Sequence, residues 1–425
     1  MKLRINMFLL YNLLIYPITL IMRLVGFFIP KIHERNQNIK KSLNALNKIE
    51  HSKKIIWFHS ASMGEFEQAK PIIEFIKNIN KDIQIVCTFT SPSGYNTQKN
   101  YSFADVICYL PNDTYFSAKS FINTVKPLVA VFIRYELWFN YLTILKENNI
   151  YSYLVNATFP VKIRVSNILK PFYKNILEKF NEIYAVTLQD TKYFIDLNLK
   201  QPKIHHSSDT RIDRIIAKAE EAKKMPVIKR DIFSTNEIIL VAGSVWHKDI
   251  DILTEASSNF ANKYPNRLRL IFVPHEPTQE NIRYIQNKIP KTILLSEILN
   301  NHNEKEINDK TIIVDSIGHL LKLYGVADIA YIGGGFGVGV HSIAEPAGYG
   351  IPITVGSNCY NSPDIYGLLS FQAIEIVDDS EMLLNWLIKV NEREYREKCG
   401  NAAKEYIHSN SGSTEAIANA IMLNI

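Results

Sequence analysis

The segment between Ile332 and Pro352 gives the richest chemical signal in this 425-residue chain, because five of the seven residues 333–339 are glycine. The pattern predicts a strand, a loop with exposed backbone and then a short helix. The N–H groups of such a loop and the dipole of the helix can hold a phosphate. Glu345, about one turn into the helix, is placed to accept hydrogen bonds from ribose hydroxyls. A tight turn without a ligand is the alternative, although five glycines exceed what a turn needs.

A carboxylate follows the apolar run Ile55 to His59, in the sequence HSASMGE that ends at Glu65. Gly64 would let backbone N–H groups approach an anion or a sugar at the start of the next helix, where Glu65 could act as a base. The alternative is an ordinary helix start, with Ser62 as the N-cap and Glu65 closing a capping box. The residues alone leave both interpretations open.

Two more charged groups follow apolar runs in the N-terminal half. Arg134 and Glu136 lie at the end of one predicted strand, where they could orient a sugar hydroxyl or form an ion pair with each other. Arg211 lies in the sequence SSDTRID, where it could neutralise a phosphate while Asp209 and Asp213 hold the loop.

The C-terminal half offers three further turns at predicted strand ends, at residues 241–244, 274–276 and 315–319. The last begins a helix and could present backbone donors to a base or a phosphate, although His319 could equally be an exposed helix cap. The histidines are dispersed and none has HExxH or HxxxH spacing, so we predict no metal site.

Short apolar strands alternating with helical patterns must position these residues, which is typical of a parallel sheet covered on both faces. A charged stretch around Ile215 to Arg230 interrupts the alternation, and we interpret it as an interdomain link. We expect an α/β protein of two Rossmann-like domains facing a cleft, with ligands at the carboxyl ends of the strands. The predicted strands are 55–59, 83–90, 104–110, 127–133, 151–156 and 182–186 before the link, and 238–242, 268–273, 311–314, 328–332, 352–355 and 373–377 after it.

The N-terminal stretch from Ile5 to Met22 carries no charge and, with Val25 to Ile29, is just long enough to cross a bilayer. Pro17 and Arg23 weaken that interpretation, and cations lie on both sides of the stretch. We predict a membrane anchor at residues 1–30. It could span the membrane or lie along the interface with Lys and Arg meeting lipid phosphates, and a buried core helix is the remaining alternative.

The composition excludes several classes of protein. The formal net charge of +6 comes without an Arg-rich run interleaved with aromatics, so we expect no nucleic acid as a partner. The four cysteines are scattered, which gives neither a disulfide framework nor a zinc site and fits a reducing cytoplasm. No P-loop is present, and no GxGxxG follows the first strand of the second half, so a standard ATP or NAD site is not expected.

Taken together, these segments make the chain similar to the 3-deoxy-D-manno-octulosonic acid (Kdo) transferases, which add Kdo from CMP-Kdo to the lipid A precursor in Gram-negative bacteria. The resemblance runs along essentially the whole chain, including the N-terminal anchor, and depends on the order and spacing of the motifs. They are HSASMGE (59–65), SPSGY (91–95), YLPNDT (109–114), RYELWFN (134–140), SDTRIDR (208–214), AGSVW (242–246), VPHE (273–276), DSIGHL (315–320) and GGGFGVGVHSIAEPAGYGIPI (333–353).

The resemblance implies a GT-B fold and an inverting, metal-independent transfer without a cofactor. An acceptor-binding domain at 31–222 and a CMP-sugar-binding domain at 223–425 would follow the anchor. Glu65 matches the family's proton acceptor, and Glu136 and Arg211 match positions that stabilise the transition state. The implied nucleotide contacts are Pro274, His275, Ile317, Gly318, His319, Ser342, Ile343, Ala344 and Glu345.

Two departures from the family pattern bear on these roles. Many members have Gly at Ser208 and Lys at Arg211; Arg keeps the charge, whereas Ser can alter the turn. Many also have Asn-Pro-Leu at residues 342–344, where this chain has Ser-Ile-Ala.

The resemblance further implies an enzyme at the cytoplasmic face of the inner membrane, with CMP-Kdo as donor and the lipid A precursor lipid IV(A) as acceptor. Two alternatives stay open. One is a GT-B transferase or an epimerase that acts on a UDP-sugar, and the other is a non-catalytic, membrane-bound nucleotide-sugar binder.

Overall fold

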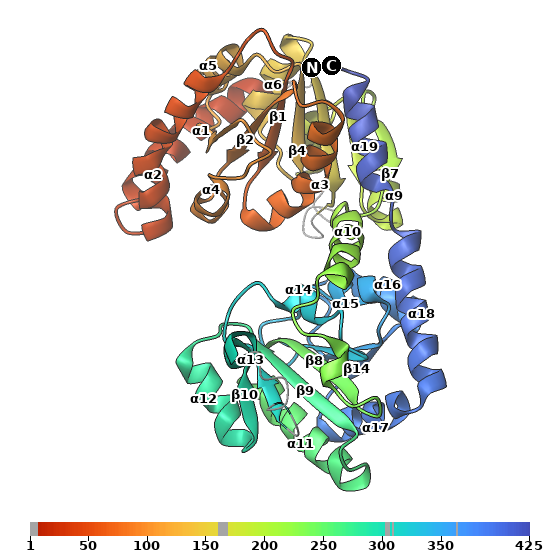
Figure 1. Cartoon of the computed structure of the whole chain (residues 1–425). Coiled ribbons are helices and arrows are strands. Elements are labelled where there is room, and N and C mark those ends of the chain that lie inside the picture. Colours follow the sequence, from red (N-terminus) through yellow and green to blue (C-terminus); the bar gives the residue numbers. More distant parts are fainter. Residues whose placement is uncertain (1–6, 160–168, 302–306, 308–309, 363) are drawn as a thin grey trace. The chain divides into compact units, whose positions relative to one another are not determined.

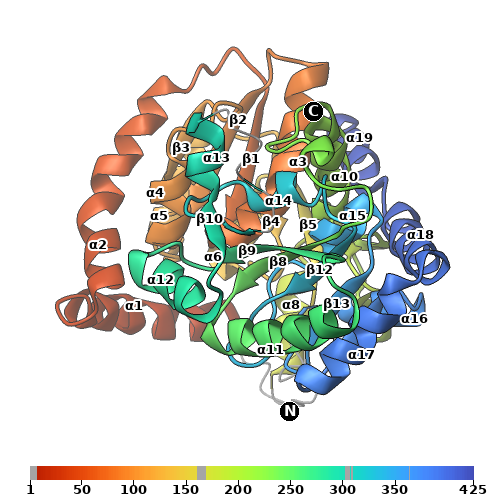
Figure 2. The same cartoon turned by 60° about the horizontal axis from the view of Figure 1, so that its bottom comes forward.

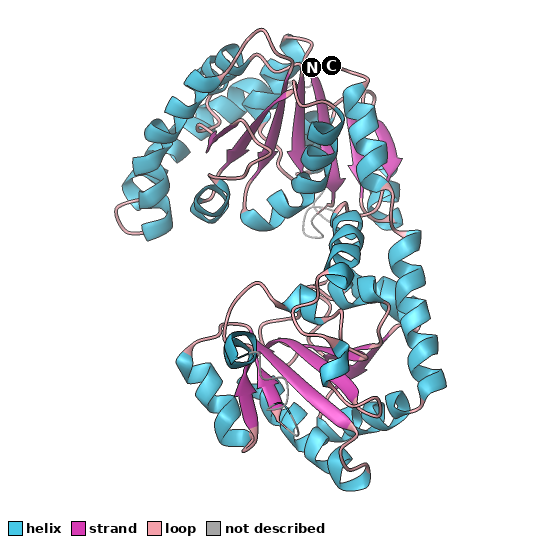
Figure 3. Cartoon of the chain, viewed as in Figure 1, coloured by secondary structure: helices cyan, strands magenta, loops and turns pink. Residues whose placement is uncertain are grey.

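A computed structural model describes residues 7–159, 169–301, 307, 310–362 and 364–425 of the chain. It divides into two compact units, one made of Met1–Asp213 with Ser411–Ile425 and the other of Arg214–Asn410. Each unit is built on a seven-stranded parallel sheet with helices on both sides (Figures 1 and 3). The predicted α/β class is confirmed, and the fold is that of GT-B proteins, as the structural comparisons below show.

The first unit has strand order β3-β2-β1-β4-β5-β6-β7, and all neighbours pair in parallel. Its strands are β1 (Ile55–Ser60), β2 (Gln84–Phe89), β3 (Val106–Tyr109), β4 (Val129–Ile133), β5 (Tyr151–Ala157), β6 (Glu182–Ala185) and β7 (Lys203–His206). Its helices are α1 (Met7–Val25), α2 (Pro30–Leu43), α3 (Met63–Ile79), α4 (Pro92–Gln98), α5 (Tyr115–Val125), α6 (Phe139–Glu147), α8 (Lys170–Leu177), α9 (Leu188–Asp196) and α19 (Ser413–Met422).

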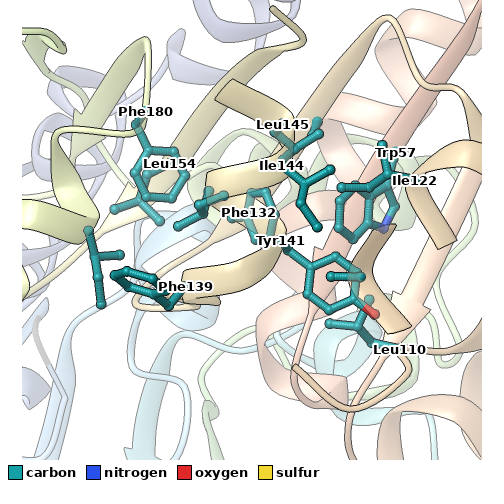
Figure 4. Close-up of a cluster of buried hydrophobic side chains, with 14 of the residues drawn as sticks. Trp57, Leu110, Ile122, Phe132, Phe139, Tyr141, Ile144, Leu145, Leu154 and Phe180 are labelled. Carbon is teal, nitrogen blue, oxygen red and sulfur yellow. The ribbon is translucent and has the colours of Figure 1, made fainter. Parts of the chain in front are cut away.

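Alternate residues of the central strands pack into two separate cores. Ile55 and Trp57 of β1 face one core, which α5, α6, α8 and α9 complete (Figure 4). Ile56 and Phe58 face the other, which α3 and α19 cover. This period of two inside an otherwise all-buried strand is what a parallel sheet with helices on both faces requires.

The second unit repeats this plan with strand order β10-β11-β9-β8-β12-β13-β14. Its strands are β8 (Ile238–Val245), β9 (Leu268–Pro274), β10 (Thr292–Leu294), β11 (Thr311–Ile313), β12 (Ile329–Ile332), β13 (Ile353–Gly356) and β14 (Ile374–Val377). Its helices are α11 (His247–Lys263), α12 (Gln279–Lys288), α13 (Leu295–Asn301), α14 (Leu320–Leu323), α15 (Ala344–Tyr349), α16 (Asp364–Ser370), α17 (Ser380–Asn391) and α18 (Arg393–Ser409). One core of this sheet is closed by α11 and α17.

All twelve predicted strands are present, with ends that differ by a few residues. The sequence reading missed β7 and β10, which lie at sheet edges. Edge strands have one unpaired side, and β7, with the sequence KIHH, has no buried residue. A pattern search for continuous apolar runs therefore passes over them.

The division into units differs from the predicted domains 31–222 and 223–425. Helix α10 (Arg211–Lys224) crosses the boundary at Asp213, just before the charged stretch that was interpreted as a link. The chain then returns at Ser411, so that α19 packs on the first unit beside α3. The sequence contains no signal that its last segment goes back to the first unit.

The predicted N-terminal anchor corresponds to α1, and its first six residues lie outside the described part of the chain. Helix α1 is long and apolar enough to cross a membrane, with a mean hydropathy of 1.8. None of its residues is buried, which contradicts the alternative of a core helix. Helix α2 follows it along the outside of the unit, next to β3 (Figure 2).

Candidate active site

A buried chain of hydrogen bonds lies at the carboxyl ends of β1 and β4, which are parallel neighbours. The Trp57 indole N–H donates to Thr88 Oγ1 at 2.8 Å, and Thr88 Oγ1 lies 2.8 Å from His59 Nδ1. On the other side of the ring, His59 Nε2 lies 3.1 Å from Glu136 Oε2. Since Thr88 already accepts from Trp57, its hydroxyl can donate to Nδ1, which leaves Nε2–H to donate to Glu136.

Glu136 is thereby held in place. The indole N–H of Trp138 also donates to Glu136 Oε2, at 2.8 Å, and the residue is only 7% exposed. The ion pair between Arg134 and Glu136, one of the two alternatives for these residues, is not among the salt bridges of the described residues; His59 pairs with Glu136 instead. A carboxylate with two fixed donors on one oxygen keeps its orientation, which a role in charge stabilisation would need.

Glu65 lies in the first turn of α3, and its carboxylate caps the start of this helix. Oε2 accepts the backbone N–H groups of Ala61, at 2.6 Å, and of Ser62, at 3.1 Å. The capping arrangement expected as the alternative is therefore present. Within the described residues Oε1 has no hydrogen bond, so one oxygen stays available to a substrate.

The surroundings of Glu65 make it a stronger base than an exposed carboxylate. Burial raises its pKa, and the negative charge of Glu136 raises it further, while the two backbone hydrogen bonds and His59 oppose this. A carboxyl group whose pKa lies above its usual range is better suited to general-base work near neutral pH.

Gly64 lies beside this carboxylate with open space around it. A Cβ atom at Gly64 would meet nothing within 4 Å, so protein packing does not require glycine there. The space is consistent with a ligand that approaches the start of α3, as the sequence suggested.

Arg211 lies at the start of α10 and is fixed by Asp209. Its Nε and Nη2 both donate to Asp209 Oδ2, at 3.0 and 2.7 Å. Gln68, one turn beyond Glu65 in α3, donates to the same oxygen at 2.7 Å. Burial acts to raise the pKa of Asp209, but the Arg211 charge and these hydrogen bonds outweigh it and hold that pKa below its usual range.

The structure thus gathers the three predicted catalytic residues in the first unit. Glu65 and Glu136 are close enough for one charge to shift the pKa of the other. Arg211 connects to the same helix through Asp209 and Gln68. The sequence reading missed Thr88, Gln68 and Trp138 as supporting residues, because their roles depend on contacts between strands and helices far apart in the chain.

In the second unit, backbone packing accounts for most of the glycine-rich loop. A Cβ at Gly333 would lie 2.4 Å from the Ser244 carbonyl oxygen, and one at Gly335 would lie 2.6 Å from Gly356. Gly334 and Gly339 have φ values of 92° and 100°. Only at Gly337, among these five, is the space open. The excess of glycine therefore reflects close strand-to-strand turns and is weaker support for a phosphate site than the sequence suggested.

Several N–H groups of this loop are also occupied. Gly334 N–H donates to Asp249 Oδ2 at 2.9 Å, and Val340 N–H donates to Asn361 Oδ1 at 3.0 Å. Gly337 and Gly339 both donate to the carbonyl of Gly334. The loop is thus a rigid support more than an open cradle of donors.

Three rings stack next to this loop, and the sequence reading did not foresee them. The ring centroid of His275 lies 4.6 Å from that of Trp246 and 4.4 Å from that of His341, with nearly parallel planes. Trp246 and His275 follow β8 and β9, which are paired, while His341 follows the glycine-rich loop. Burial and the neighbouring His275 lower the pKa of His341, against the pull of Asp249, which favours the neutral form of this ring.

The other predicted nucleotide contacts differ in whether their side chains or only their backbone groups are accessible. Ile317 is 82% exposed, Gly318 has a φ of 91°, and His319 is the first residue before α14, without a side-chain cap bond. The side chains of Ile343 and Ala344 are buried, which leaves only their backbone for a ligand. The remaining predicted contacts are Pro274, which ends β9, and Ser342 and Glu345, which are half-buried around the start of α15.

Comparison with known proteins adds to this geometry. A family model described as 3-deoxy-D-manno-octulosonic-acid transferase (kdotransferase) matches residues 31–214. The chain is 27% identical to the 3-deoxy-D-manno-octulosonic acid transferase of Haemophilus influenzae over 371 residues, which is 85% of each chain.

Solved structures resemble the chain in fold. UDP-GlcNAc 2-epimerase from Neisseria meningitidis, bound to UDP-GlcNAc, superimposes with a TM-score of 0.61 at 14% identity over 87% of this chain and 99% of that chain. MurG from Acinetobacter baumannii gives a TM-score of 0.54 at 12% identity over 87% of this chain and 99% of that chain.

Proposed function

Since this chain belongs to the family of Kdo transferases, we propose that it transfers Kdo from CMP-Kdo to the lipid A precursor lipid IV(A). It is a glycosyltransferase of lipopolysaccharide synthesis; the donor and the acceptor are the proposed parts. The observation that carries the proposal is the arrangement at the start of α3, where a buried Glu65 with a raised pKa keeps one oxygen unbonded beside the open space at Gly64.

In the proposed reaction Glu65 accepts the proton of a sugar hydroxyl of the acceptor, and the hydroxyl oxygen attacks the anomeric carbon of Kdo. The bond between that carbon and the CMP phosphate breaks, and the phosphate leaves with the bonding electrons. The transfer inverts the anomeric configuration because there is one displacement and no covalent enzyme intermediate. A cation must stabilise the negative charge that develops on the phosphate, and we propose that Arg211 is this cation.

Glu136 and Arg211 are proposed to stabilise the transition state. His59 and Trp138 fix Glu136, and Asp209 fixes Arg211, so neither side chain needs to reorganise during the reaction. No metal ion or cofactor enters the proposal.

We propose that the first unit binds the acceptor and the second unit binds the CMP moiety. The proposed base lies in the first unit, as an acceptor hydroxyl requires. In the second unit the proposed contacts are the polar edge of His275, whose ring faces are covered by Trp246 and His341, the exposed turn at Ile317 to His319 and the start of α15.

Mass spectrometry of lipid IV(A) incubated with CMP-Kdo and the purified full-length protein tests the proposal. We expect product masses increased by whole Kdo residues, and no such product would overturn it. Glu65→Gln keeps an oxygen for the N–H groups of Ala61 and Ser62 and should lower kcat roughly 10²–10⁴-fold without a loss of stability. Glu67→Gln, two residues further along α3, is the matched control and should retain activity.

Ligand protection separates the alternatives. CMP but not UDP should raise the melting temperature if the donor is CMP-Kdo. Protection by UDP would favour a transferase or epimerase for a UDP-sugar. Protection by CMP with no product in the assay would favour a non-catalytic binder.

A further inference from the structure

Helix α1 rests on the first unit through one narrow stripe. The Tyr11 hydroxyl donates to Asp113 Oδ2 at 2.7 Å, and its ring stacks on Phe139 with centroids 4.7 Å apart. Asn12 and Asn140 exchange two hydrogen bonds of 3.1 Å each. Phe8, one turn earlier, meets Tyr115 edge to face. The positions 8, 11 and 12 follow the spacing of one helix face.

The partners of this stripe belong to the folded core of the unit. Asp113 is 2% exposed and also accepts the backbone N–H groups of Asn140 and Tyr141 at the start of α6. Asn140 is fully buried. The contacts with α1 therefore continue a network that fixes α6, so α1 is part of the unit's structure.

The rest of the surface of α1 is apolar and exposed. The turn after it adds two aromatic side chains, Phe27 at 76% and Phe28 at 87% exposure. Phe116 of α5, at 74% exposure, extends the apolar surface onto the folded unit, next to a groove of about 520 Å³ lined by Phe8, Tyr16 and Tyr115. The exposed large apolar residues of α1 itself are Leu9, Leu10, Leu13, Leu14, Tyr16, Ile18, Leu20, Ile21, Met22 and Leu24.

The charges around this surface are mostly positive, although Glu147 lines the groove beside Phe116. Residues 7–43 contain five Lys or Arg and one carboxylate, Glu34. Arg23, Lys31, Lys40 and Lys41 are exposed, while Glu34 is half-buried and accepts from Asn96. An apolar face bordered by exposed cations is complementary to the acyl chains and phosphates of an anionic bilayer.

Docking on the unit and crossing a bilayer exclude each other for α1. The helix has 19 residues, and at about 1.5 Å per residue it could only just span the hydrocarbon core if it stood upright. Tyr11 and Asn12 would then lie within the hydrocarbon, away from Asp113 and Asn140. Tyr11 and Asn12 would lose these hydrogen bonds in an apolar medium, and Asp113 and Asn140 would lose their partners on α1.

We propose that α1 is an in-plane membrane anchor, which lies along the surface of an anionic phospholipid bilayer while Tyr11 and Asn12 hold it on the first unit. Its Leu-rich face, the turn at Phe27 and Phe28, and Phe116 enter the acyl-chain boundary. Arg23 and the exposed lysines of α2 meet the lipid phosphates. The first unit is thus held against one leaflet with α1 parallel to it, whatever sugar donor the protein uses.

Spin-label depth measurements on the full-length protein bound to vesicles of phosphatidylethanolamine and phosphatidylglycerol test this geometry. All four native cysteines are buried, so a thiol label reports an introduced one. Labels at Leu9→Cys, Leu13→Cys, Leu20→Cys and Leu24→Cys should lie at one shallow depth. A label at Ile15→Cys, a half-buried position on the docked side, should be less accessible to lipid-dissolved oxygen than its neighbours.

A spanning helix gives a different pattern. The depth would then pass through a maximum near the middle of α1, with positions 9 and 24 in opposite leaflets, and Ile15 would be as accessible to oxygen as Leu13. That pattern would overturn the proposal.

Vesicle flotation tests the surface itself with variants that leave the fold intact. Leu13→Asp should weaken binding to the anionic vesicles roughly tenfold or more, because it removes an apolar side chain that the proposal places in the bilayer and adds a negative charge that anionic lipids repel. Asn47→Asp, which adds the same charge at an exposed polar position, should change binding less than twofold. Equal binding of Leu13→Asp and the unchanged protein, or equal binding to anionic and purely zwitterionic vesicles, would contradict the proposal.

Discussion

At the scale of single residues, the two oxygens of Glu65 have separate tasks. Oε2 accepts two backbone N–H groups and fixes the start of α3, while Oε1 is unbonded within the described residues. The sequence pattern predicted a base and a capping box as alternatives, and the geometry shows that one carboxylate can serve both. The residues alone could not decide this, because the choice depends on which oxygen the helix end uses.

Replacing Glu136 tests the electrostatic coupling of the two carboxylates. The charge of Glu136 raises the pKa of Glu65, so Glu136→Gln should lower that pKa. A base with a lower pKa stays deprotonated at lower pH, and the acid limb of the kcat/KM profile should move to lower pH even as the rate falls. Glu67→Gln should leave the limb in place. An unmoved limb in Glu136→Gln would mean that a group other than Glu65 controls it.

Asp113 makes the stability of the first unit depend on pH. Burial raises its pKa to about 7, although Tyr11 and the N–H groups at the start of α6 oppose this. The unfolded carboxyl titrates near 3.9. Between these values the folded protein holds the extra proton, so the free energy of unfolding falls as pH rises from about 4 to 7, by roughly 3–4 kcal/mol.

Asp113→Asn should flatten this pH dependence. The amide has a similar size but no titration, so urea unfolding followed by hydrogen exchange in α6 should give nearly equal stabilities at pH 5 and pH 7.5. In the unchanged protein the stability at pH 7.5 should be the lower of the two. A variant with the same slope as the unchanged protein would show that other groups cause it.

At the scale of the elements, most strands were predictable, and the two that were missed, β7 and β10, are edge strands. β4 is an unbroken apolar run and β1 begins with four apolar residues, and the helices between strands follow from the same alternation. β10 has three residues, of which only Ile293 is buried, and it lies at a sheet edge. The catalytic edge of the first unit was therefore predictable in outline, since both β1 and β4 lead into it.

For the glycine-rich loop, the sequence predicted more than the structure supports. Its composition suggested a ligand, but four of its five glycines are needed where the backbones of neighbouring turns meet or where φ is positive. A sequence does not distinguish a glycine that makes room for a ligand from one that makes room for a neighbouring strand, because the Cβ atom is absent in both cases.

Alanine at two of these glycines separates the two cases. At Gly335 a Cβ would lie 2.6 Å from the Gly356 backbone, so Gly335→Ala should cost about 1–3 kcal/mol and lower the melting temperature by roughly 3–10 °C. At Gly337 the space is open, and Gly337→Ala should change it by less than about 2 °C. Thermal unfolding of both variants gives the answer, and equal effects would contradict the packing explanation.

At the scale of the whole molecule, the division into two units does not follow the point where the alternation of predicted strands and helices is interrupted. Ile417, Ala418 and Ile421 of α19 are fully buried in the core that α3 also closes, in the first unit. Their spacing predicts a helix with one buried face, but not which sheet that face covers. For this reason the sequence could not predict that the last fifteen residues return to the first unit.

Substitutions that disrupt the packing of α19 should therefore lower the stability of the first unit and leave that of the second unchanged. The double variant Ile417→Ala/Ile421→Ala removes two fully buried side chains and should cost about 4–8 kcal/mol, because each leaves a cavity against α3 and the sheet. Hydrogen exchange should speed up in α3 and β1, while α11 and β8 keep their protection. Asn419→Ala, on the exposed face of the same helix, should change neither unit. Faster exchange in α11 and β8 at the same level would mean that α19 supports the second unit as well and that the units do not unfold separately.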